Sequence, residues 1–330
     1  MNAQRVTVFG DGGWGTCLAV GLAGKGFAVT LWGVSPDYVR EMARSRQNPK
    51  FLPGIPLPES LRLTADPAEA VGQAEVVVVA VPSPYLRQTL ARVAAPTRAA
   101  VVSVVKGLEP KTLLRMSEVI TQVWHTPDVV VVSGPSIAYE VARGVPTTVV
   151  AAARDAARAE RVQQLFSTER FRVYRSADVI GVELGGALKN IIAIAAGIAD
   201  GLGFGANTKS ALLARGLSEM ARLGVAMGAQ RETFSGVSGV GDLATTCFSE
   251  HSRNRRLGEA IAKGKTLQEI QGATEQVAEG AVAVQSAVTL AARHHVEMPI
   301  TQEVARVLYE GKSAQNAVRD LMLRDPKEED

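Results

Sequence analysis

The pattern of apolar residues divides the chain into two parts. Short apolar runs in the first part predict strands at residues 5–10, 26–33, 75–82, 99–107, 128–135, 147–153 and 171–176. The runs from residue 75 onward are apolar at nearly every position, so both faces of a sheet built from them must be covered. Helical spacing at residues 14–25 and between most later runs supplies the covering helices. We therefore predict an α/β domain over residues 1–178, with a doubly wound parallel sheet between helix layers.

The second part has a different pattern. From about Asp178 to Leu323 the apolar residues have helical spacing, the turns are rich in glycine, and no run is a convincing strand. A chain of 330 residues also exceeds one ordinary domain, so each part is long enough to bury its own core. We therefore predict an all-helical C-terminal domain over residues 179–330.

Composition excludes several classes of protein. Hydrophobic residues make up 46% of the chain and charged residues 21%, with no signal-peptide pattern and no uninterrupted apolar run long enough to span a bilayer, so we expect a cytoplasmic protein without membrane insertion. Cys17, Cys247 and the four histidines have no ligand spacing, so no metal site is expected. A net charge of +3 is too small to indicate nucleic-acid binding.

The first predicted strand leads into a glycine motif. Gly10, Gly12 and Gly15 have G-x-G-x-x-G spacing where a predicted strand ends and a predicted helix begins, which is typical of the Rossmann dinucleotide fold. The glycines allow a tight turn and let the backbone approach a pyrophosphate at the helix N-terminus. The alternative is a purely structural glycine-rich turn. A carboxylate at Asp11 would repel the pyrophosphate unless its side chain points away.

The choice between NAD and NADP is normally visible after the second strand. An acid there binds the ribose hydroxyls of NAD, and an arginine accepts the phosphate of NADP. This sequence has Gly33, Val34 and Ser35 at that place, while Asp37 and Arg40 lie too far along to assign. The sequence therefore leaves the cofactor open as NAD or NADP.

A single lysine interrupts the apolar stretch "ELGGALKNIIAIAAG" at residues 183–197. On a helix Lys189 lies off the apolar stripe and beside small residues such as Gly185, Gly186, Ala193 and Ala196. One interpretation is a helix-packing seam from which the lysine extends to solvent. The other is room that the small residues leave for a ligand to reach the ammonium.

Four further segments carry a family resemblance. They are "VSVVKGLEP", "VVSGPSIAYEVARGVPTTV", "ELGGALKNIIAIAAGIADGLGFGANTKSALL" and "FSGVSGVGDLATTCFSEHSRNRRLG". In this order, and with the glycine motif, they resemble the bacterial NAD(P)-dependent glycerol-3-phosphate dehydrogenases. The resemblance implies a Rossmann domain followed by a helical domain, a homodimer, and reversible hydride transfer between NAD(P)H and dihydroxyacetone phosphate, giving sn-glycerol 3-phosphate for phospholipid synthesis.

The resemblance also assigns roles to residues. It implies that Lys189 exchanges a proton with the substrate oxygen and that Lys106 contacts substrate and cofactor. We count Asp242 with these catalytic residues because a carboxylate can orient the Lys189 ammonium and favour its charged form. The implied substrate-binding residues are Lys106, Gly134, Ser136, Lys189, Asn190, Asp242, Thr246, Ser252, Arg253 and Asn254. The implied cofactor-binding residues are Gly10, Gly12, Gly13, Trp14, Gly15, Val34, Ser35, Lys106, Ala138, Arg253, Val277 and Glu279. Two positions depart from the family: Gly13 replaces a serine, and neither Val34 nor Ser35 is basic.

These residue types suit ketone reduction. A lysine can donate a proton to the developing alkoxide and stabilise its charge, and a second cation nearby would lower the lysine pKa. Arg253 and Asn254 offer guanidinium and amide donors for a phosphate, with Ser252 as a helix cap. Two other functions stay open: a related β-hydroxyacid dehydrogenase, which would bind a carboxylate, and a nucleotide-sensing module without turnover.

Overall fold

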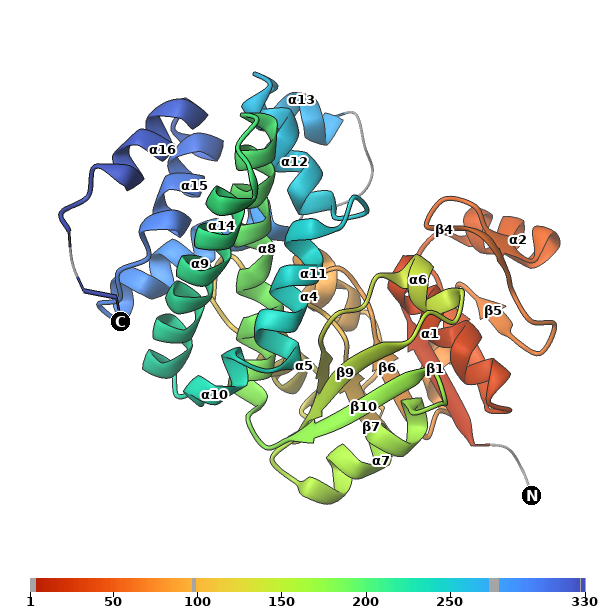
Figure 1. Ribbon diagram of the computed structural model, residues 1–330. Helices are drawn as coiled ribbons and strands as arrows, with labels where there is room; N and C mark the ends of the chain where they lie inside the picture. The colour runs from red at the N-terminus through yellow and green to blue at the C-terminus, as the bar shows by residue number, and fades with distance from the viewer. Residues whose placement is uncertain (1–3, 97–98, 273–278, 327, 330) are drawn as a thin grey trace. The chain divides into compact units, whose positions relative to one another are not determined.

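The computed structural model describes residues 4–96, 99–272, 279–326 and 328–329, which fold into two compact units (Figure 1). The described residues within 1–105 and 116–179 form the first unit, and those within 106–115 and 180–330 form the second. The prediction that residues 1–178 form one continuous domain is wrong for residues 106–115. This segment belongs to the second unit because Leu108 and Leu113 are buried in its hydrophobic core.

The first unit contains an eight-stranded sheet among its described residues, in the order β10-β9-β8-β7-β6-β1-β2-β5. The strands are β1 (Arg5–Phe9), β2 (Ala28–Trp32), β5 (Arg62–Thr64), β6 (Val76–Val79), β7 (Ala100–Ser103), β8 (Val130–Ser133), β9 (Thr147–Ala152) and β10 (Phe171–Ser176). Every predicted run contains one of these strands, while β5 was not predicted. The expectation of an entirely parallel sheet is wrong at one place, because β8 and β9 pair in antiparallel fashion.

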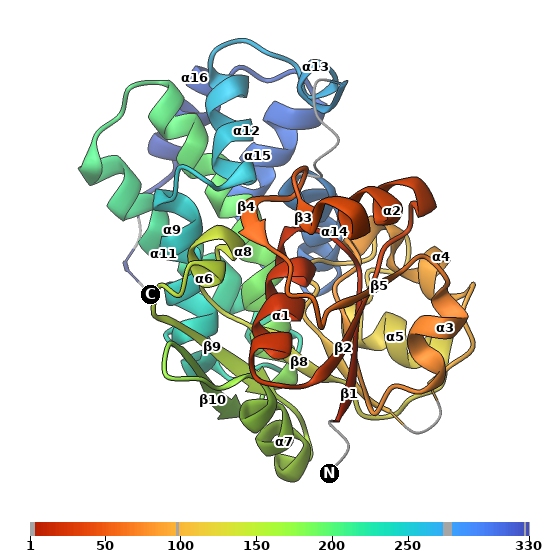
Figure 2. The same cartoon turned by 90° about the vertical axis from the view of Figure 1, so that its right-hand side faces the viewer.

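Helices cover both faces of this sheet, as the uninterrupted apolar runs require. All four residues of β6 are buried, so neither face of that strand meets solvent. In Figure 2, α1, α6 and α7 lie on one side of the sheet and α3, α4 and α5 on the other. These helices are α1 (Gly13–Gly24), α3 (Pro67–Gly72), α4 (Leu86–Leu90), α5 (Met116–Trp124), α6 (Ala138–Ala142) and α7 (Ala156–Phe166).

An additional helix and a hairpin follow β2, before β5. The helix α2 (Pro36–Ser45) leads into a hairpin of β3 (Gln47–Asn48) and β4 (Leu52–Pro56), which the sequence did not predict. Asn48 is fully buried and anchors the hairpin, since its Nδ2 donates to the Asp11 carbonyl at 2.8 Å and to Thr16 Oγ1 at 2.7 Å. The hairpin is thereby fixed to the glycine turn between β1 and α1.

The second unit is helical in its described residues apart from an isolated bridge between Leu108 and Arg115, which confirms the predicted class. Its elements are α8 (Val179–Gly201), α9 (Ala206–Ala226), α10 (Arg231–Phe234), a π-helical turn η2 (Val237–Gly241), α11 (Asp242–Phe248), α12 (Arg253–Ala262), α13 (Leu267–Gly272), α14 (Glu279–Arg293), α15 (Pro299–Tyr309) and α16 (Ala314–Met322).

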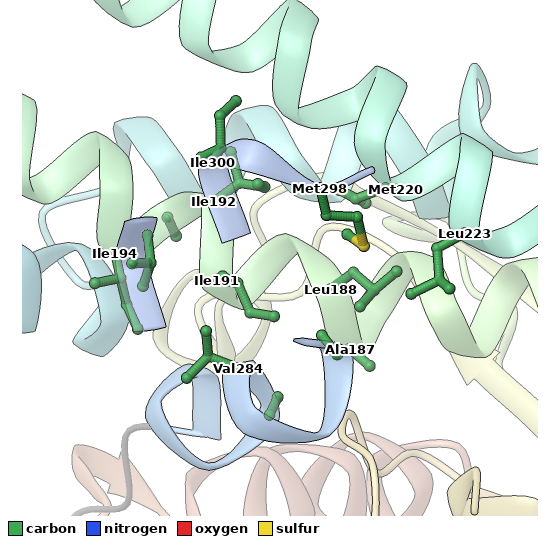
Figure 3. Close-up of a cluster of buried hydrophobic side chains, with 14 of the residues drawn as sticks. Ala187, Leu188, Ile191, Ile192, Ile194, Met220, Leu223, Val284, Met298 and Ile300 are labelled. Carbon is green, nitrogen blue, oxygen red and sulfur yellow. The ribbon is translucent and has the colours of Figure 1, made fainter. Parts of the chain in front are cut away.

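The long helix α8 is the centre of this unit. Figure 3 shows its apolar residues meeting side chains of α9, α14 and the start of α15, including Met220, Val284 and Ile300. Among the described helices, only α8 is long and apolar enough to cross a membrane, and 83% of its most apolar window is buried inside the protein. Core helices of folded domains have the same length and hydropathy. The predicted one-sided apolar stripe is therefore too narrow, because nearly the whole circumference of α8 is covered.

Candidate active site

Three charged residues of the second unit form a buried cluster. Lys189 Nζ lies 2.5 Å from Asp242 Oδ1, and Lys106 Nζ lies 2.7 Å from Asp242 Oδ2. The exposed fractions of the side chains are 7% for Lys189, 1% for Asp242 and 14% for Lys106. The carboxylate thus bridges two ammonium groups that come from segments 83 residues apart in the sequence (189 minus 106). The family resemblance had assigned these three residues to one site, and the fold brings them together.

Thr246 completes the surroundings of the Lys189 ammonium. Lys189 Nζ donates to Thr246 Oγ1 at 2.7 Å, and this hydroxyl in turn donates to the Asp242 carbonyl at 2.7 Å, one helical turn earlier. Thr246 was expected to line the substrate pocket. Its hydroxyl accepts a hydrogen bond from the Lys189 ammonium, a contact that the sequence did not indicate, and its contact with the substrate stays a prediction.

The position of Asp242 depends on glycines in the preceding turn. A β-carbon on Gly239 would overlap the Phe234 carbonyl, and one on Gly185 would lie 2.5 Å from the Ser238 carbonyl oxygen. Gly239 therefore permits η2 to pack against the end of α10, and Gly185 permits η2 to lie directly against α8. The helix α11 then starts at Asp242, beside Lys189. At Gly185 the packing interpretation of the small residues is correct, because backbone atoms of Ser238 fill the space that the other interpretation left for a ligand.

Burial changes the proton affinity of Lys189. Desolvation lowers the pKa of its ammonium from 10.5 to about 8; the Asp242 charge opposes this change, and the Lys106 charge adds to it. A charged group removed from water loses hydration, so the neutral amine becomes accessible near neutral pH. Lys189 can therefore donate a proton or accept one under ordinary conditions.

A buried ion pair connects the two segments that carry the lysines. Arg115 Nη1 lies 2.5 Å from Glu183 Oε2, with side-chain exposures of 8% and 3%. Glu183 belongs to α8, and Arg115 ends the segment that begins with Lys106. The sequence prediction missed this pair. Its one signal was Glu183, an acid in an otherwise apolar stretch, since such a residue is rarely buried unless it is paired.

The start of α12 presents the residues expected to bind phosphate. Ser252 caps the helix, as predicted, by accepting a hydrogen bond from the Arg255 amide at 3.2 Å. Arg253 is exposed and has no ion pair within the described ranges, whereas Arg255 is paired with Asp200 at 2.6 Å and with Glu259. Of these two arginines in the "RNRR" cluster, only Arg253 is therefore available to an anion.

Two buried asparagines lie where α14 meets α8. Asn254 Oδ1 accepts a hydrogen bond from the Gly280 amide at 3.0 Å, so its NH₂ group is the one left for a ligand. A β-carbon on Gly280 would lie 2.6 Å from the Asn190 carbonyl oxygen, which shows how closely the helices approach. Glu279 is the first residue of α14. The predicted contact residue Val277 lies outside the described residues.

The glycine motif in the first unit has the geometry of a dinucleotide turn. Gly10 has φ +128°, and a β-carbon there would lie 2.8 Å from the Ala80 backbone. A β-carbon on Gly15 would overlap the Gly10 carbonyl, whereas one on Gly12, before the first residue of α1, would have no neighbour within 4 Å. The turn is therefore tight at two glycines and open at the third, where a pyrophosphate could approach the helix N-terminus.

The structure explains one departure from the family. A β-carbon on Gly13 would lie 2.6 Å from the Phe51 carbonyl oxygen of the β3–β4 turn, so a serine does not fit here without moving the hairpin. The same β-carbon would lie 3.8 Å from Ala138 Cβ, which places the start of α6 beside the glycine turn. Trp14 packs near Phe171, with ring centroids 6.3 Å apart.

The remaining predicted residues of the first unit lie on two loops. Gly134 has φ +139°, and Ser136 Oγ donates to its carbonyl at 2.9 Å, so this segment is a tight turn before α6. Ser35 caps α2 by accepting from the Tyr38 amide, and Val34 is 66% exposed. Neither residue after β2 supplies a charge to a cofactor.

Comparisons with known proteins give a consistent result. The sequence profile for the N-terminus of NAD-dependent glycerol-3-phosphate dehydrogenase matches residues 5–159, and the profile for its C-terminus matches residues 178–319. The chain is 50% identical to a glycerol-3-phosphate dehydrogenase, NAD(P)+, of Citrifermentans bemidjiense and 49% identical to one of Chlorobium phaeobacteroides, with 99% of each chain covered. The crystal structure of glycerol-3-phosphate dehydrogenase from Coxiella burnetii is similar with a TM-score of 0.93 at 38% identity, covering 98% of this chain and 100% of that one.

Proposed function

The chain belongs to the NAD-dependent glycerol-3-phosphate dehydrogenase family, and on that premise we propose that it transfers hydride reversibly between NAD(P)H and dihydroxyacetone phosphate. The product of the reduction is sn-glycerol 3-phosphate, a precursor for phospholipid synthesis. The observation that carries the proposal is the buried cluster of Lys106, Asp242 and Lys189, because a ketone can be reduced only if its oxygen also receives a proton.

The first unit fits a nicotinamide dinucleotide. Gly10 and Gly15 allow the tight turn, and Gly12 leaves open space at the N-terminus of α1, whose backbone amides would hold the pyrophosphate. Gly13, Trp14 and Ala138 lie at or beside this turn and would contact the cofactor. When bound, the dinucleotide supplies the hydride in one direction and accepts it in the other.

Lys189 donates a proton to the substrate oxygen or removes one from it. In the direction of reduction, its ammonium donates a proton to the alkoxide that develops on the carbonyl oxygen; in oxidation, its neutral amine removes the hydroxyl proton. Asp242 and Thr246 fix the direction of Nζ through contacts of 2.5 and 2.7 Å. Lys106 adds a second positive charge that stabilises the developing oxyanion.

The phosphate of the substrate would bind at the start of α12. Arg253 supplies a guanidinium that no acidic group of the described chain neutralises, and the Asn254 NH₂ group adds a neutral donor. In the second unit, Lys106 and Asn190 complete the proposed substrate contacts. Gly134 and Ser136 of the first unit stay predicted substrate contacts. This set selects a phosphorylated triose over one without phosphate.

The test compares dihydroxyacetone phosphate with unphosphorylated dihydroxyacetone while nicotinamide absorbance is followed. We expect rapid oxidation of the reduced cofactor only with the phosphate ester. Equal rates on both compounds would refute the phosphate role of Arg253 and Asn254. Turnover of 3-hydroxy acids instead of the triose phosphate would favour a β-hydroxyacid dehydrogenase, and cofactor binding without any turnover would favour a nucleotide sensor.

The resemblance to the bacterial enzymes also led us to expect a homodimer, and the composition led us to expect a cytoplasmic protein. Both stay predictions. Size-exclusion chromatography with light scattering on the full chain tests the first, and a monomer under assay conditions would contradict it. Fractionation of the producing cells tests the second.

A further inference from the structure

No acidic residue directly follows β2 in the sequence, but the side chain of Asp11 lies at the end of this strand. The usual ribose-binding position after this strand holds Gly33, followed by Val34 and Ser35. A β-carbon on Gly33 would overlap Asp11 Oδ2 and would lie 2.8 Å from Asp11 Cγ. The carboxylate of Asp11, from the glycine turn, therefore fills the volume in which a side chain at position 33 would begin.

The sheet register brings these two residues together. Phe9 of β1 pairs with Trp32 of β2, and the Gly10 amide donates to the Trp32 carbonyl at 3.0 Å. The next residue of each strand therefore leaves the sheet at the same edge, where the carboxyl ends of parallel strands form the cofactor crevice. Asp11 and Gly33 are thus neighbours although 22 residues separate them (33 minus 11).

The backbone at Asp11 is held firmly. Its carbonyl accepts hydrogen bonds from Thr16 Oγ1 at 3.2 Å and from Asn48 Nδ2 at 2.8 Å. With the carbonyl fixed by α1 and by the hairpin, the carboxylate of the side chain lies against Gly33 at the end of β2.

Asp11 interacts electrostatically with Lys50 and Tyr38. Burial raises the pKa of the Asp11 carboxyl from 3.8 to about 6, and the positive charge of Lys50 opposes the change. Lys50 Nζ also lies 5.9 Å from the Tyr38 ring centroid, and the Asp11 charge is among the causes that raise the pKa of the Tyr38 hydroxyl. Above about pH 7 the carboxylate is therefore ionised at the edge of β2.

We propose that Asp11 determines the choice of cofactor: its carboxylate accepts hydrogen bonds from the adenosine ribose hydroxyls of NAD and repels the 2′-phosphate of NADP. An acid from the glycine turn thus replaces the acid that other Rossmann domains carry at the end of the second strand. The inference deepens the proposed function and rests on it only in that the first unit binds a nicotinamide dinucleotide.

The main experiment measures equilibrium dissociation constants of NADH and NADPH on the full chain without substrate, by nicotinamide fluorescence. We expect the wild type to bind NADH more tightly at pH 8. In Asp11→Asn the ratio of the two constants should shift toward NADPH by about tenfold to hundredfold, the range expected for removing one like-charge contact. Wild-type protein that binds NADPH as tightly as NADH, or an unchanged ratio in Asp11→Asn, would overturn the proposal.

Asp37→Asn is the matched control. Asp37 is the next acid after β2, but its side chain is 90% exposed and is paired with Arg40. Its neutralisation should leave the ratio unchanged, and an equal shift in both variants would show a general effect of net charge and overturn the specific role of Asp11. A thermal unfolding curve establishes that each variant is folded, and Asp11→Ser provides a second neutral variant if Asp11→Asn is not.

The pH dependence gives an independent measurement. As pH falls through about 6 the Asp11 carboxyl becomes neutral, so NADPH binding by the wild type should strengthen relative to NADH. The 2′-phosphate also titrates near this pH. The pH dependence of Asp11→Asn measures the contribution of the phosphate alone. The difference between the pH profiles of the wild type and the variant therefore measures the contribution of the Asp11 carboxyl. Identical pH profiles would overturn the proposal. Tight NADH binding without reduction of dihydroxyacetone phosphate would refute the proposed function but leave this inference intact.

Discussion

The two proposed sites of this protein are built from different parts of the polypeptide. The dinucleotide turn of the first unit consists mainly of backbone, because Gly10, Gly12 and Gly15 contribute space and amides but no side chain. The proton-transfer cluster of the second unit consists of charged side chains, with Asp242 joined to two buried lysines. A site built from backbone keeps its function after a substitution that leaves the space beside the backbone open. A cluster of buried charges loses its function when one of the charged side chains is removed.

The largest effect that this comparison predicts is on catalysis by Lys189→Met. Methionine has a similar length but no ionisable proton to donate, so kcat should fall by about two to four orders of magnitude, the usual range for losing a positioned acid. The dissociation constant of NADH should stay close to that of the wild type, because the glycine turn belongs to the first unit. Steady-state kinetics and NADH fluorescence measure the two quantities, and a near-normal kcat would remove Lys189 from the mechanism.

The buried pair of Arg115 and Glu183 should give the next largest effect. Removing one partner leaves a charge without compensation, which costs about 3–5 kcal/mol of stability. Arg115→Met should therefore lower the free energy of unfolding by that amount, measured by urea denaturation. The double variant Arg115→Met with Glu183→Leu should recover most of the loss, since an apolar pair can replace a buried ion pair.

Arg62→Met is the matched control for this experiment. Arg62 pairs with Glu69, but the exposed fractions of the two side chains are 65% and 36%. Such a pair contributes about 0–1 kcal/mol, so its removal should be barely measurable. If Arg115→Met lowers the free energy of unfolding no more than Arg62→Met does, the ion pair of Arg115 and Glu183 does not hold the Lys106 segment against α8.

Two alanine substitutions distinguish the roles of the glycines in the backbone site. A β-carbon on Gly15 would overlap the Gly10 carbonyl, so Gly15→Ala should destabilise the protein by about 1–3 kcal/mol. A β-carbon on Gly12 has open space, so Gly12→Ala should fold normally but weaken NADH binding by about tenfold, since its methyl group stands where the backbone must approach the pyrophosphate. Equal unfolding curves and equal NADH affinities for the two variants would contradict this division.

The backbone site could be predicted from the sequence more fully than the charged cluster. The spacing of three glycines between a strand and a helix specifies the local geometry, because all its parts lie within a few residues of one another. Lys106, Lys189 and Asp242 have no such spacing and were assigned through resemblance. The pair of Arg115 and Glu183 was missed because nothing local connects residues 68 positions apart.

Errors arose where sequence shows the absence of a side chain but not what takes its place. Gly185 beside Lys189 suggested room for a ligand, but the Ser238 carbonyl fills that space. Gly33 has no side chain, so the sequence left the choice of cofactor open, whereas in the structure the Asp11 carboxylate fills the space at this position. The direction of β9 could not be predicted either, since a strand that is buried on both faces has the same composition whether it runs parallel or antiparallel to β8.

The smallest predicted effect sharpens the comparison inside the charged cluster. Thr246 accepts a hydrogen bond from the Lys189 ammonium at 2.7 Å, which favours the charged form of the lysine. Reduction of dihydroxyacetone phosphate needs that charged form, so its kcat should be constant at low pH and fall as pH rises through about 8. Oxidation needs the neutral amine, and its kcat should rise through the same pH.

Thr246→Val removes the hydroxyl and keeps the shape of the side chain. Because the charged form of Lys189 then loses a hydrogen bond, its pKa should fall, and the decline of kcat for reduction should begin at lower pH than in the wild type. Thr246→Ser keeps the hydroxyl and should retain the wild-type profile. Measuring kcat against pH with saturating substrate and cofactor separates these outcomes. A profile in Thr246→Val that coincides with the wild type, or moves to higher pH, would mean that the Thr246 hydroxyl does not stabilise the charged form of Lys189.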